Sequence, residues 1–378
     1  MPGFELVGDE ERAALDALFD EGGVLFAHGF DAMRKHFHVR EFEGAVAERL
    51  DCNHALAVTS GTAATKIALK ALGVGPGDEV ITQAFNFIAT IEAILETGAT
   101  PIIANIDNTL NIDPGELSAL ITDRTKALIP VHMLGVPAEM NEILAISRAR
   151  EIPVLEDACE ALGAEYNNQP VGSLGEVGAI SFDFGKVITC GEGGMVLTNQ
   201  APIDRFAREY HDHGHENNPS LPRGRDTMTI HGFNYRITEM QAVVGKVQLS
   251  RLDTILEMNN ERYTAFDESF ADATPTRRIP TEAKPINDTF IMLIAEQETR
   301  QRVVKALNDA GFGTKNLPDA MEWHCAAYWE HALEPTQVER AAATRDLLMT
   351  AVAVPIWLRK TPAEYTALGE LVRGVVDD

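Results

Sequence analysis

The sequence of 378 residues contains no apolar run of the roughly 18 residues that a membrane-spanning helix needs. Its first residues also lack the basic start and apolar centre of a signal peptide, because the acidic residues Asp9, Glu10 and Glu11 follow closely. These two absences favour a cytoplasmic protein that has no membrane partner.

Cysteine and positive charge are scarce as well. The four cysteines have no Cys-x-x-Cys spacing, which favours reduced thiols and argues against a zinc site or another metal centre. Lys and Arg number 32 against 57 Asp and Glu, so the formal charge is −25. Such a chain repels phosphates, which makes nucleic acid and anionic membranes poor partners. A salt adaptation and an ordinary acidic surface explain this charge equally well.

What the sequence does contain is the pattern of a packed α/β protein. Hydrophobic residues make up 45% of the chain, and short apolar runs alternate with amphipathic stretches between residues 54 and 198. We expect seven strands, at 54–59, 79–82, 101–104, 126–131, 152–156, 179–184 and 194–198. Helices are expected at 62–72, 87–97, 114–121 and 137–150. This alternation predicts a mostly parallel seven-stranded sheet, whose last two strands lie close enough in sequence to be antiparallel.

The length suggests more than one domain. We expect an N-terminal segment at 1–45, a large domain at 46–255 and a smaller α+β domain at 256–378. Residues 237–256 have helical periodicity, and a final helix is expected at 362–376. In an open α/β sheet, ligands bind beyond the carboxyl ends of the strands, so we expect the ligand-binding residues at those ends.

Three segments at strand ends could bind a ligand. Ser60-Gly61-Thr62 joins a strand to a helix, where backbone amides and hydroxyls can hold a phosphate. A simple helix cap by Ser60 or Thr62 is the alternative interpretation. Asp157 ends an apolar strand as a fixed charge or a cap. Phe87 follows the second strand, where it could belong to the core or stack on a flat ring.

Lys186 is the candidate nucleophile. It lies between a strand and the glycine-rich turn Gly191-Glu192-Gly193-Gly194, and its neighbours are apolar. We expect burial to lower the pKa of its amine, so that it can form a Schiff base; a surface lysine on a hairpin is the alternative. A phosphate cradle, an aromatic ring, a carboxylate and such a lysine together match the attachments of pyridoxal 5′-phosphate.

These segments resemble the DegT–StrS family of fold type I, pyridoxal-phosphate-dependent sugar aminotransferases. The resemblance is carried by Ser60-Gly61-Thr62, Glu156-Asp157-Ala158, the stretch from Ser181-Phe182 through Lys186 to Gly194, and Gly232-Phe233-Asn234-Tyr235-Arg236. It implies that Lys186 binds the cofactor aldehyde and that Asp157 pairs with the pyridine nitrogen. It also implies phosphate binding by Gly61, Thr62 and Ser181, ring stacking by Phe87, and a homodimer in which Asn234 reaches the neighbouring subunit's phosphate.

One position departs from the family pattern. Glu160 stands where many members carry Gln or His near the cofactor's phenolic oxygen. Within the family, three further stretches resemble the branch that forms 8-amino-3,8-dideoxy-manno-octulosonate: the opening Met1–Leu6, Asp212-His213-Gly214-His215, and Asn316 with Glu322-Trp323-His324. For such a sugar acid, Arg223 and Arg225 are candidate carboxylate ligands. His213 and His215 are candidates for the sugar hydroxyls.

The resemblance therefore implies an aminotransferase that moves an amino group from glutamate or a similar donor to a sugar aldehyde or ketone, with pyridoxamine phosphate as the intermediate. The product would serve cell-surface polysaccharides such as lipopolysaccharide. A nucleotide-linked keto-sugar aminotransferase, a sugar dehydratase, an amino acid transaminase and a non-catalytic cofactor-binding regulator are the alternatives. The presence of Lys186 argues against the dehydratase, and the acidic charge argues against a DNA-binding regulator.

Overall fold

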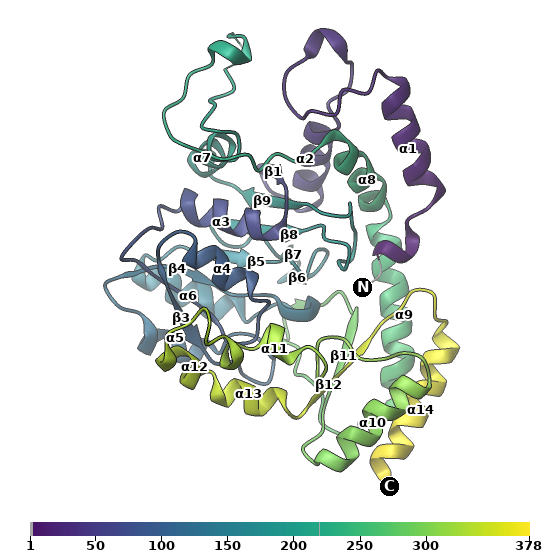
Figure 1. Cartoon of the computed structure of the whole chain (residues 1–378). Coiled ribbons are helices and arrows are strands. Elements are labelled where there is room, and N and C mark those ends of the chain that lie inside the picture. Colours follow the sequence, from purple (N-terminus) through teal and green to yellow (C-terminus); the bar gives the residue numbers. More distant parts are fainter. Residues whose placement is uncertain (1–2, 219) are drawn as a thin grey trace.

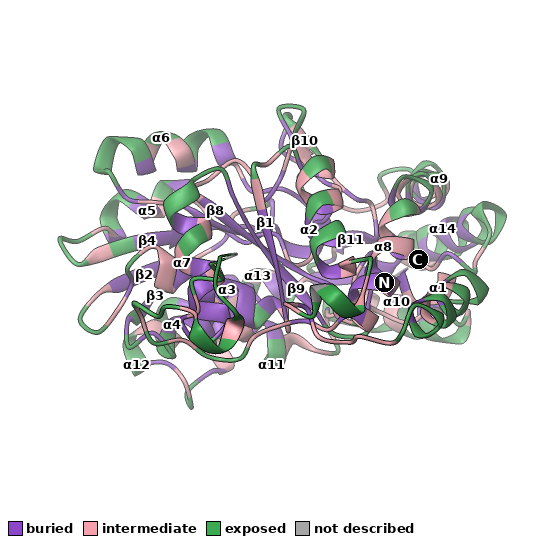
Figure 2. Cartoon of the chain, turned by 90° about the horizontal axis from the view of Figure 1, so that it is seen from above, coloured by how far each residue is buried: buried purple, intermediate pink, exposed green. Residues whose placement is uncertain are grey.

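The computed structural model of the chain describes residues 3–218 and 220–378. Its central strands are β1 (His54–Val58), β2 (Glu79–Gln83), β3 (Thr100–Ala104), β4 (Thr125–Ile129), β5 (Leu155–Asp157), β8 (Val177–Ser181) and β9 (Gly194–Thr198). The helices around them are α2 (His38–Arg49), α3 (Gly61–Ala71), α4 (Ala89–Leu95), α5 (Pro114–Leu120), α6 (Met140–Arg150) and α7 (Ala201–His211). Figure 1 shows these strands layered between helices, and Figure 2 shows that they form the buried middle of the molecule.

The strands are buried on both faces, because neighbouring residues of an extended chain point in opposite directions. In β1, Ala55 and Ala57 face a core that also contains side chains of α2, α5 and α6. Leu56 and Val58 face a second core, built with α3, α4 and α7. A strand with two apolar faces reads as a continuous apolar run, which is why the expected strands are found close to their expected positions.

The expected single seven-stranded sheet is wrong. The hydrogen-bonded order is β3-β2-β4 in one sheet and β1-β9-β8-β5 in another. Between β4 and β5 there are two isolated parallel bridges, Leu128 to Val154 and Val131 to Asp157. Pro130 and Pro153 lie in this seam, and a proline can accept but not donate a ladder hydrogen bond. The antiparallel pairing of β8 and β9 is confirmed.

The C-terminal part has a core of its own. Its strands β11 (Thr289–Leu293) and β12 (Ala351–Pro355) pair antiparallel, and they pack with α9 (Leu252–Phe270), α10 (Gln297–Asp309) and α14 (Pro362–Asp377). Figure 1 shows this part below and to the right of the central strands. The division of the chain into three domains stays a prediction.

The remaining elements are short, except for the longer helices α1 and α8. The helices are α1 (Asp9–Asp20), α8 (Glu239–Ser250), α11 (Met321–His324), α12 (Pro335–Arg340) and α13 (Ala342–Leu348). The 3-10 turns are η1 (Gly3–Leu6), η2 (Asp31–Met33), η3 (Met133–Gly135), η4 (Arg223–Arg225) and η5 (Ala326–Tyr328). The short strands are β6 (Glu165–Tyr166), β7 (Gln169–Pro170) and β10 (Ala283–Lys284). No helix within 3–218 and 220–378 is both long and apolar enough to cross a bilayer.

Candidate functional site

A cavity of about 450 Å³ opens beyond the carboxyl ends of β1, β2, β4, β5 and β8. This is the edge of the sheet layer where an α/β fold binds its ligands. The C-terminal part closes the cavity from the opposite side. The lining of the cavity includes Lys186 and residues from all three strand-end segments that the sequence singled out. The C-terminal part contributes further side chains to the lining: Asp288, Lys315, Asn316 and His324.

The start of α3 forms one wall of the cavity. Ser60 caps the helix, since its hydroxyl accepts a hydrogen bond from the amide of Ala63 at 3.1 Å. The capping interpretation of Ser60 is therefore confirmed. Gly61 lies so close to β8 and β5 that an added Cβ would come 2.8 Å from the Cβ of Ser181 and 2.9 Å from the sulfur of Cys159. Thr62 is exposed at the cavity, where its hydroxyl and the helix amides offer donors to an anion.

Asp157 ends β5 and is buried at the cavity floor. Its carboxylate accepts hydrogen bonds from the hydroxyl of Thr90 at 2.6 Å and from the amide of Cys159 at 3.1 Å. These two donors hold the carboxyl group in one orientation. The Asp157 side chain is therefore fixed in the lining of the cavity.

Lys186 and Glu160 form an ion pair beside this floor, with the Lys186 Nζ 3.3 Å from Oε1 of Glu160. Burial tends to lower the pKa of the Lys186 amine, but the neighbouring acidic groups, Glu160 first among them, together outweigh burial and the pKa is raised. The expectation of a lowered pKa for Lys186 is therefore wrong. Burial likewise tends to raise the pKa of Glu160, yet the charges of Lys186, Lys315 and His324 bring it down to about 2. Both groups are thus charged at neutral pH.

An aromatic cluster stands at the mouth of the cavity. The ring of Phe87 lies 6.4 Å from that of Trp323, nearly parallel at 16°, and 5.5 Å from that of His324. Phe87 is 43% exposed, so it is not a core residue. Its open face is available to a flat ring in the cavity.

Several polar residues of the cavity had been given no role by sequence reasoning. Asn86 is buried and its Oδ1 accepts from Thr90, but its Nδ2 has no hydrogen-bond partner among the described residues. Lys315 donates to Asp288 at 2.6 Å, and both side chains are buried. The sequence contained a signal for Lys315, because this lysine follows the glycine-containing stretch Gly311-Phe312-Gly313. Lys186 similarly precedes the glycine-rich turn that begins at Gly191.

The expected substrate ligands are not at this cavity. Arg223 is bound by both oxygens of Asp212, and Arg225 is exposed on the same turn. His213 is exposed, and the Nδ1 of His215 lies 3.3 Å from Asp226. Asn234 is exposed beside them, where its Oδ1 accepts from the amide of Arg236.

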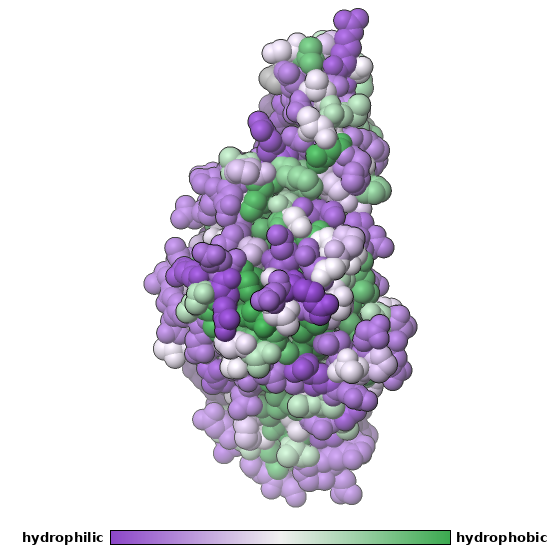
Figure 3. All heavy atoms as spheres, turned by 90° about the vertical axis from the view of Figure 1, so that its left-hand side faces the viewer, coloured by the Kyte–Doolittle hydropathy of each residue, from purple (hydrophilic) through white to green (hydrophobic). Residues whose placement is uncertain are grey.

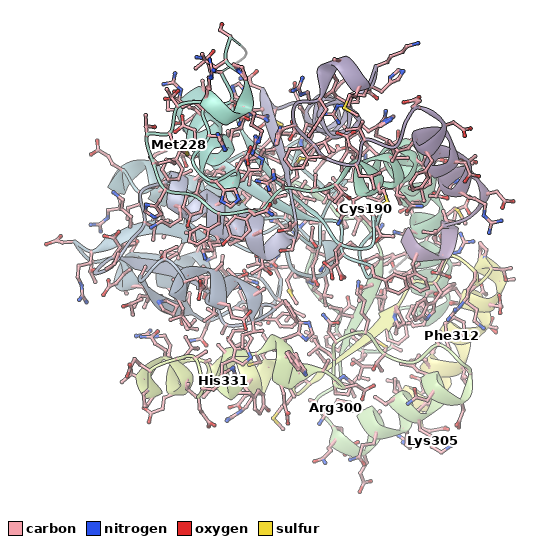
Figure 4. All side chains as sticks on the ribbon, turned by 45° about the horizontal axis from the view of Figure 1, so that its top comes forward. Cys190, Met228, Arg300, Lys305, Phe312 and His331 are labelled. Atoms are coloured by element: carbon pink, nitrogen blue, oxygen red, sulfur yellow. The ribbon has the colours of Figure 1, made fainter. Side chains whose placement is uncertain are left out.

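These residues belong to a loop that reaches away from the cavity, at the upper left of Figure 1, and Met228 marks the loop in Figure 4. The loop borders a second cavity of about 680 Å³, to which it contributes Arg223 and Asp226.

The residues of the first cavity fit pyridoxal phosphate. The close approach at Gly61 leaves the amides at the start of α3 free to meet a phosphate. The unpaired Nδ2 of Asn86 is a buried donor that awaits an acceptor. The same cavity is lined by the Asp157 carboxyl group, the Lys186 amine and the Phe87 ring, which match the attachments of the cofactor.

Comparison with known proteins gives the same answer. Residues 30–373 match the DegT/DnrJ/EryC1/StrS aminotransferase family. GDP-perosamine synthase of Caulobacter vibrioides is 37% identical over 281 residues, which cover 73% of this chain and 74% of the relative. A spore coat polysaccharide biosynthesis protein of Bacillus subtilis is 37% identical over 317 residues, with 80% and 79% covered.

Solved structures agree with these relatives. That of 3-amino-5-hydroxybenzoic acid synthase is 30% identical and superimposes with a TM-score of 0.85, covering 100% of this chain and 98% of the other. The aminotransferase from Psychrobacter cryohalolentis is 28% identical with a TM-score of 0.84, covering 97% and 96%. The chain therefore belongs to the DegT/DnrJ/EryC1/StrS family of pyridoxal-phosphate-dependent sugar aminotransferases.

Proposed function

We propose that the chain transfers an amino group from glutamate, or a similar donor, to an aldehyde or ketone of a sugar. The observation that carries this proposal is the convergence of the Lys186 amine, the Asp157 carboxylate and the start of α3 on one cavity. Pyridoxal phosphate, when bound, supplies an aldehyde that takes up amines and a ring that accepts electrons. Each further element of the chemistry is assigned to side chains of this chain.

The binding roles follow from what each side chain offers. Ser60, Gly61, Thr62 and Ser181 would hold the phosphate through amides and hydroxyls, and Phe87 would cover one face of the ring. Asp157 would keep the pyridine nitrogen protonated. Its hydrogen bonds to Thr90 and Cys159 support this role, because they fix the orientation of the carboxyl group.

Lys186 would bind the aldehyde covalently and, once displaced by the donor, would take the proton from the donor's α-carbon on its Nζ. Glu160 supports this step, because its carboxylate, 3.3 Å from Nζ, would stabilise the ammonium that Lys186 becomes when it takes the proton. Glu160 is also the residue proposed to lie near the cofactor's phenolic oxygen.

As the acceptor, we propose 8-oxo-3,8-dideoxy-manno-octulosonate, for the synthesis of a cell-surface polysaccharide. The support is the resemblance of three stretches of the chain, one of which contributes Asn316 and His324 to the cavity. The carboxylate of this acceptor needs cations, yet the described residues that line the cavity include five carboxylates and only two lysines, Lys186 and Lys315.

A homodimer with shared active sites would supply the missing cations. We propose that Asn234, Arg223 and Arg225 act at the cavity of the neighbouring subunit, with His213 and His215 beside them. Their position on an extended loop, away from their own cavity, supports this arrangement. Figure 3 adds that apolar side chains are exposed among hydrophilic ones on the side of the molecule seen at the left of Figure 1.

A nucleotide-linked keto sugar is the second candidate acceptor, because the name of the Caulobacter relative is that of a GDP-sugar enzyme. A screen of glutamate with the octulosonate aldehyde and with several nucleotide keto sugars separates the two. Formation of an amino sugar from one class alone identifies the acceptor, whereas a deoxy sugar product would indicate a dehydratase.

Substitution of Lys186 tests the chemistry itself. We expect Lys186→Ala to lose turnover by at least about 10²-fold, because the proton at the donor's α-carbon then has no base. The measurement is the conversion of glutamate to 2-oxoglutarate, and borohydride reduction followed by peptide mapping locates the bound cofactor. Near-normal turnover, or a cofactor attached to another lysine, would contradict the proposal.

A further inference from the structure

The first residues that the structure describes, Gly3–Leu6, form the short turn η1 and lie against the loop that carries Lys186. We call residues 182–190 the lysine loop and Gly3–Leu6 the N-terminal clamp. Figure 1 shows the clamp at the upper end of α9, between the central strands and the C-terminal part. In Figure 4, Cys190 and Phe312 mark the lysine loop and the C-terminal part on the same side of the molecule.

Gly3 touches the backbone of Lys186 directly. Its amide donates a hydrogen bond to the Lys186 carbonyl at 3.2 Å. Within the described residues, the Lys186 carbonyl accepts no other hydrogen bond. The approach is so close that a Cβ on Gly3 would lie 2.8 Å from the Lys186 carbonyl oxygen and 2.8 Å from the Cα of Ile188. Only glycine fits at this position, because any side chain would collide with the backbone of Lys186 and Ile188.

Phe4 extends the contact along the lysine loop and beyond it. Its ring stacks on that of Phe184 with 4.7 Å between the centroids and 22° between the planes. The same ring meets Trp357, which follows β12, edge to face at 6.4 Å. Phe184 is still 58% exposed, so Phe4 is the partner that holds its ring in place.

Glu5 and Leu6 fasten the clamp to the opposite side. The Glu5 carboxylate accepts hydrogen bonds from the amides of Leu358 at 3.1 Å and Arg359 at 3.0 Å, and its side chain is only 5% exposed. The carbonyl of Leu6 accepts from the guanidinium of Arg251, between α8 and α9, at 2.5 Å. The clamp thus connects the lysine loop with two distant parts of the chain.

We propose that the N-terminal clamp positions Lys186 for proton transfer, with Gly3, Phe4 and Glu5 as positioning residues. This inference rests on the proposed role of Lys186. The loop is otherwise held by the ion pair of Lys186 with Glu160, by the burial of Val187 and Ile188, and by two backbone hydrogen bonds of 3.1 Å, from the Lys186 amide to the Asp183 carbonyl and from the Cys190 amide to the Phe182 carbonyl. The clamp adds the contact at the lysine's own carbonyl, and a displacement of about 1 Å at a reacting group can lower a rate by up to about 10²-fold.

Hydrogen exchange of the full chain, with and without pyridoxal phosphate, tests the contact independently of activity. We expect Phe4→Ala and Gly3→Ala to raise exchange in a peptide covering 183–190 by at least about threefold, while a peptide covering β1 keeps its protection. Phe4→Tyr retains the ring and should behave as the parent chain. Glu48→Gln is the matched control for Glu5→Gln, because Glu48 is an exposed acid on α2 whose carboxylate makes no hydrogen bond or ion pair within the described residues.

The holoenzyme provides the second measurement. We expect Phe4→Ala to lower kcat of the glutamate half-reaction by about tenfold with the donor KM within about twofold, since it moves the base and leaves the donor's binding groups in place. The kcat of Glu5→Gln should fall between those of Phe4→Ala and Glu48→Gln. The proposal is overturned if Phe4→Ala equals Glu48→Gln in both measurements, or if exchange rises evenly along the chain. Absence of transamination in the parent chain would refute the proposed function, yet hydrogen exchange would still report on the clamp.

Discussion

Glu160 places a negative charge directly beside the amine of Lys186. It stands 3.3 Å from the amine of Lys186, accepts a hydrogen bond from the Leu134 amide at 3.1 Å, and keeps its negative charge despite burial. The sequence drew attention to Glu160 as a departure from the family pattern but left its charge state open. The lysines around it decide that state, and they come from parts of the chain far apart in sequence.

The depressed pKa of Glu160 predicts a pH-dependent contribution to stability. A carboxyl whose pKa falls from 4.5 to about 2 on folding stabilises the native state fully above pH 4.5. This contribution, on the order of 3 kcal/mol, is lost as the pH falls through the interval toward 2. We therefore expect Glu160→Gln to have a lower free energy of unfolding than the parent chain at pH 7. Near pH 2 the two free energies of unfolding should differ much less.

Urea unfolding at a series of pH values measures this difference. Glu10→Gln serves as the control, because that carboxylate is exposed and should change the free energy of unfolding by no more than about 1 kcal/mol. If the difference in free energy of unfolding between Glu160→Gln and the parent chain stays constant from pH 7 to pH 2, Glu160 acts through packing instead of charge.

Among the elements, α3 and the strand ends beside it form the wall of the cavity at which we propose that the phosphate binds. The helix was expected at 62–72 and is found at Gly61–Ala71. The spacing of Ser60 and Gly61 behind an apolar strand was enough to predict it, since cap and turn residues act locally. What the sequence did not contain is the distance from Gly61 to Ser181 and Cys159, which depends on how β5 and β8 are packed.

A pair of glycine substitutions tests this wall. Gly61→Ala is expected to lower the free energy of unfolding by about 1–3 kcal/mol and to weaken cofactor binding, because its Cβ has no room. Gly44→Ala is the matched control, since that glycine lies exposed within α2 with nothing near its missing Cβ. It should raise stability by about 0.5–1 kcal/mol.

Thermal unfolding and titration with pyridoxal phosphate give the two quantities. Equal stability and equal cofactor affinity in the Gly61→Ala and Gly44→Ala chains would mean that the close approach at α3 has no role in binding.

At the scale of the whole molecule, a shared active site predicts complementation between inactive chains. A Lys186→Ala chain is expected to lack the proposed base, and an Asn234→Ala chain is expected to lack a contact to its neighbour's phosphate. If each site combines Lys186 of one subunit with Asn234 of the other, a mixed dimer contains one intact site. Refolding the two chains together should then restore transamination that neither chain shows alone.

The measurement is activity as a function of mixing ratio, with the molecular mass determined by light scattering. A monomeric mass, or a mixture no more active than its components, would contradict the shared site. Lys186→Ala mixed with Lys186→Arg is the control, because no mixed dimer of these chains has an intact lysine.

The sequence by itself determined those features of the protein that depend on near neighbours. The apolar strands, the cap at Ser60, and the positions of Asp157 and Lys186 at strand ends all follow from local periodicity and spacing. The family followed from the same motifs. Local patterns suffice here because the secondary structure of a buried strand and the start of a helix are set within a few residues.

Only the tertiary structure decided which distant groups meet. Asp288 and Lys315 are 27 residues apart and face the cavity as a pair, and Gly3 contacts the carbonyl of Lys186 although the two residues are far apart in the sequence. The raised pKa of Lys186 likewise depends on Glu160, which a different loop supplies. Charge states and close packing depend on three-dimensional distance, and that distance is fixed by how the strands and the C-terminal part pack together.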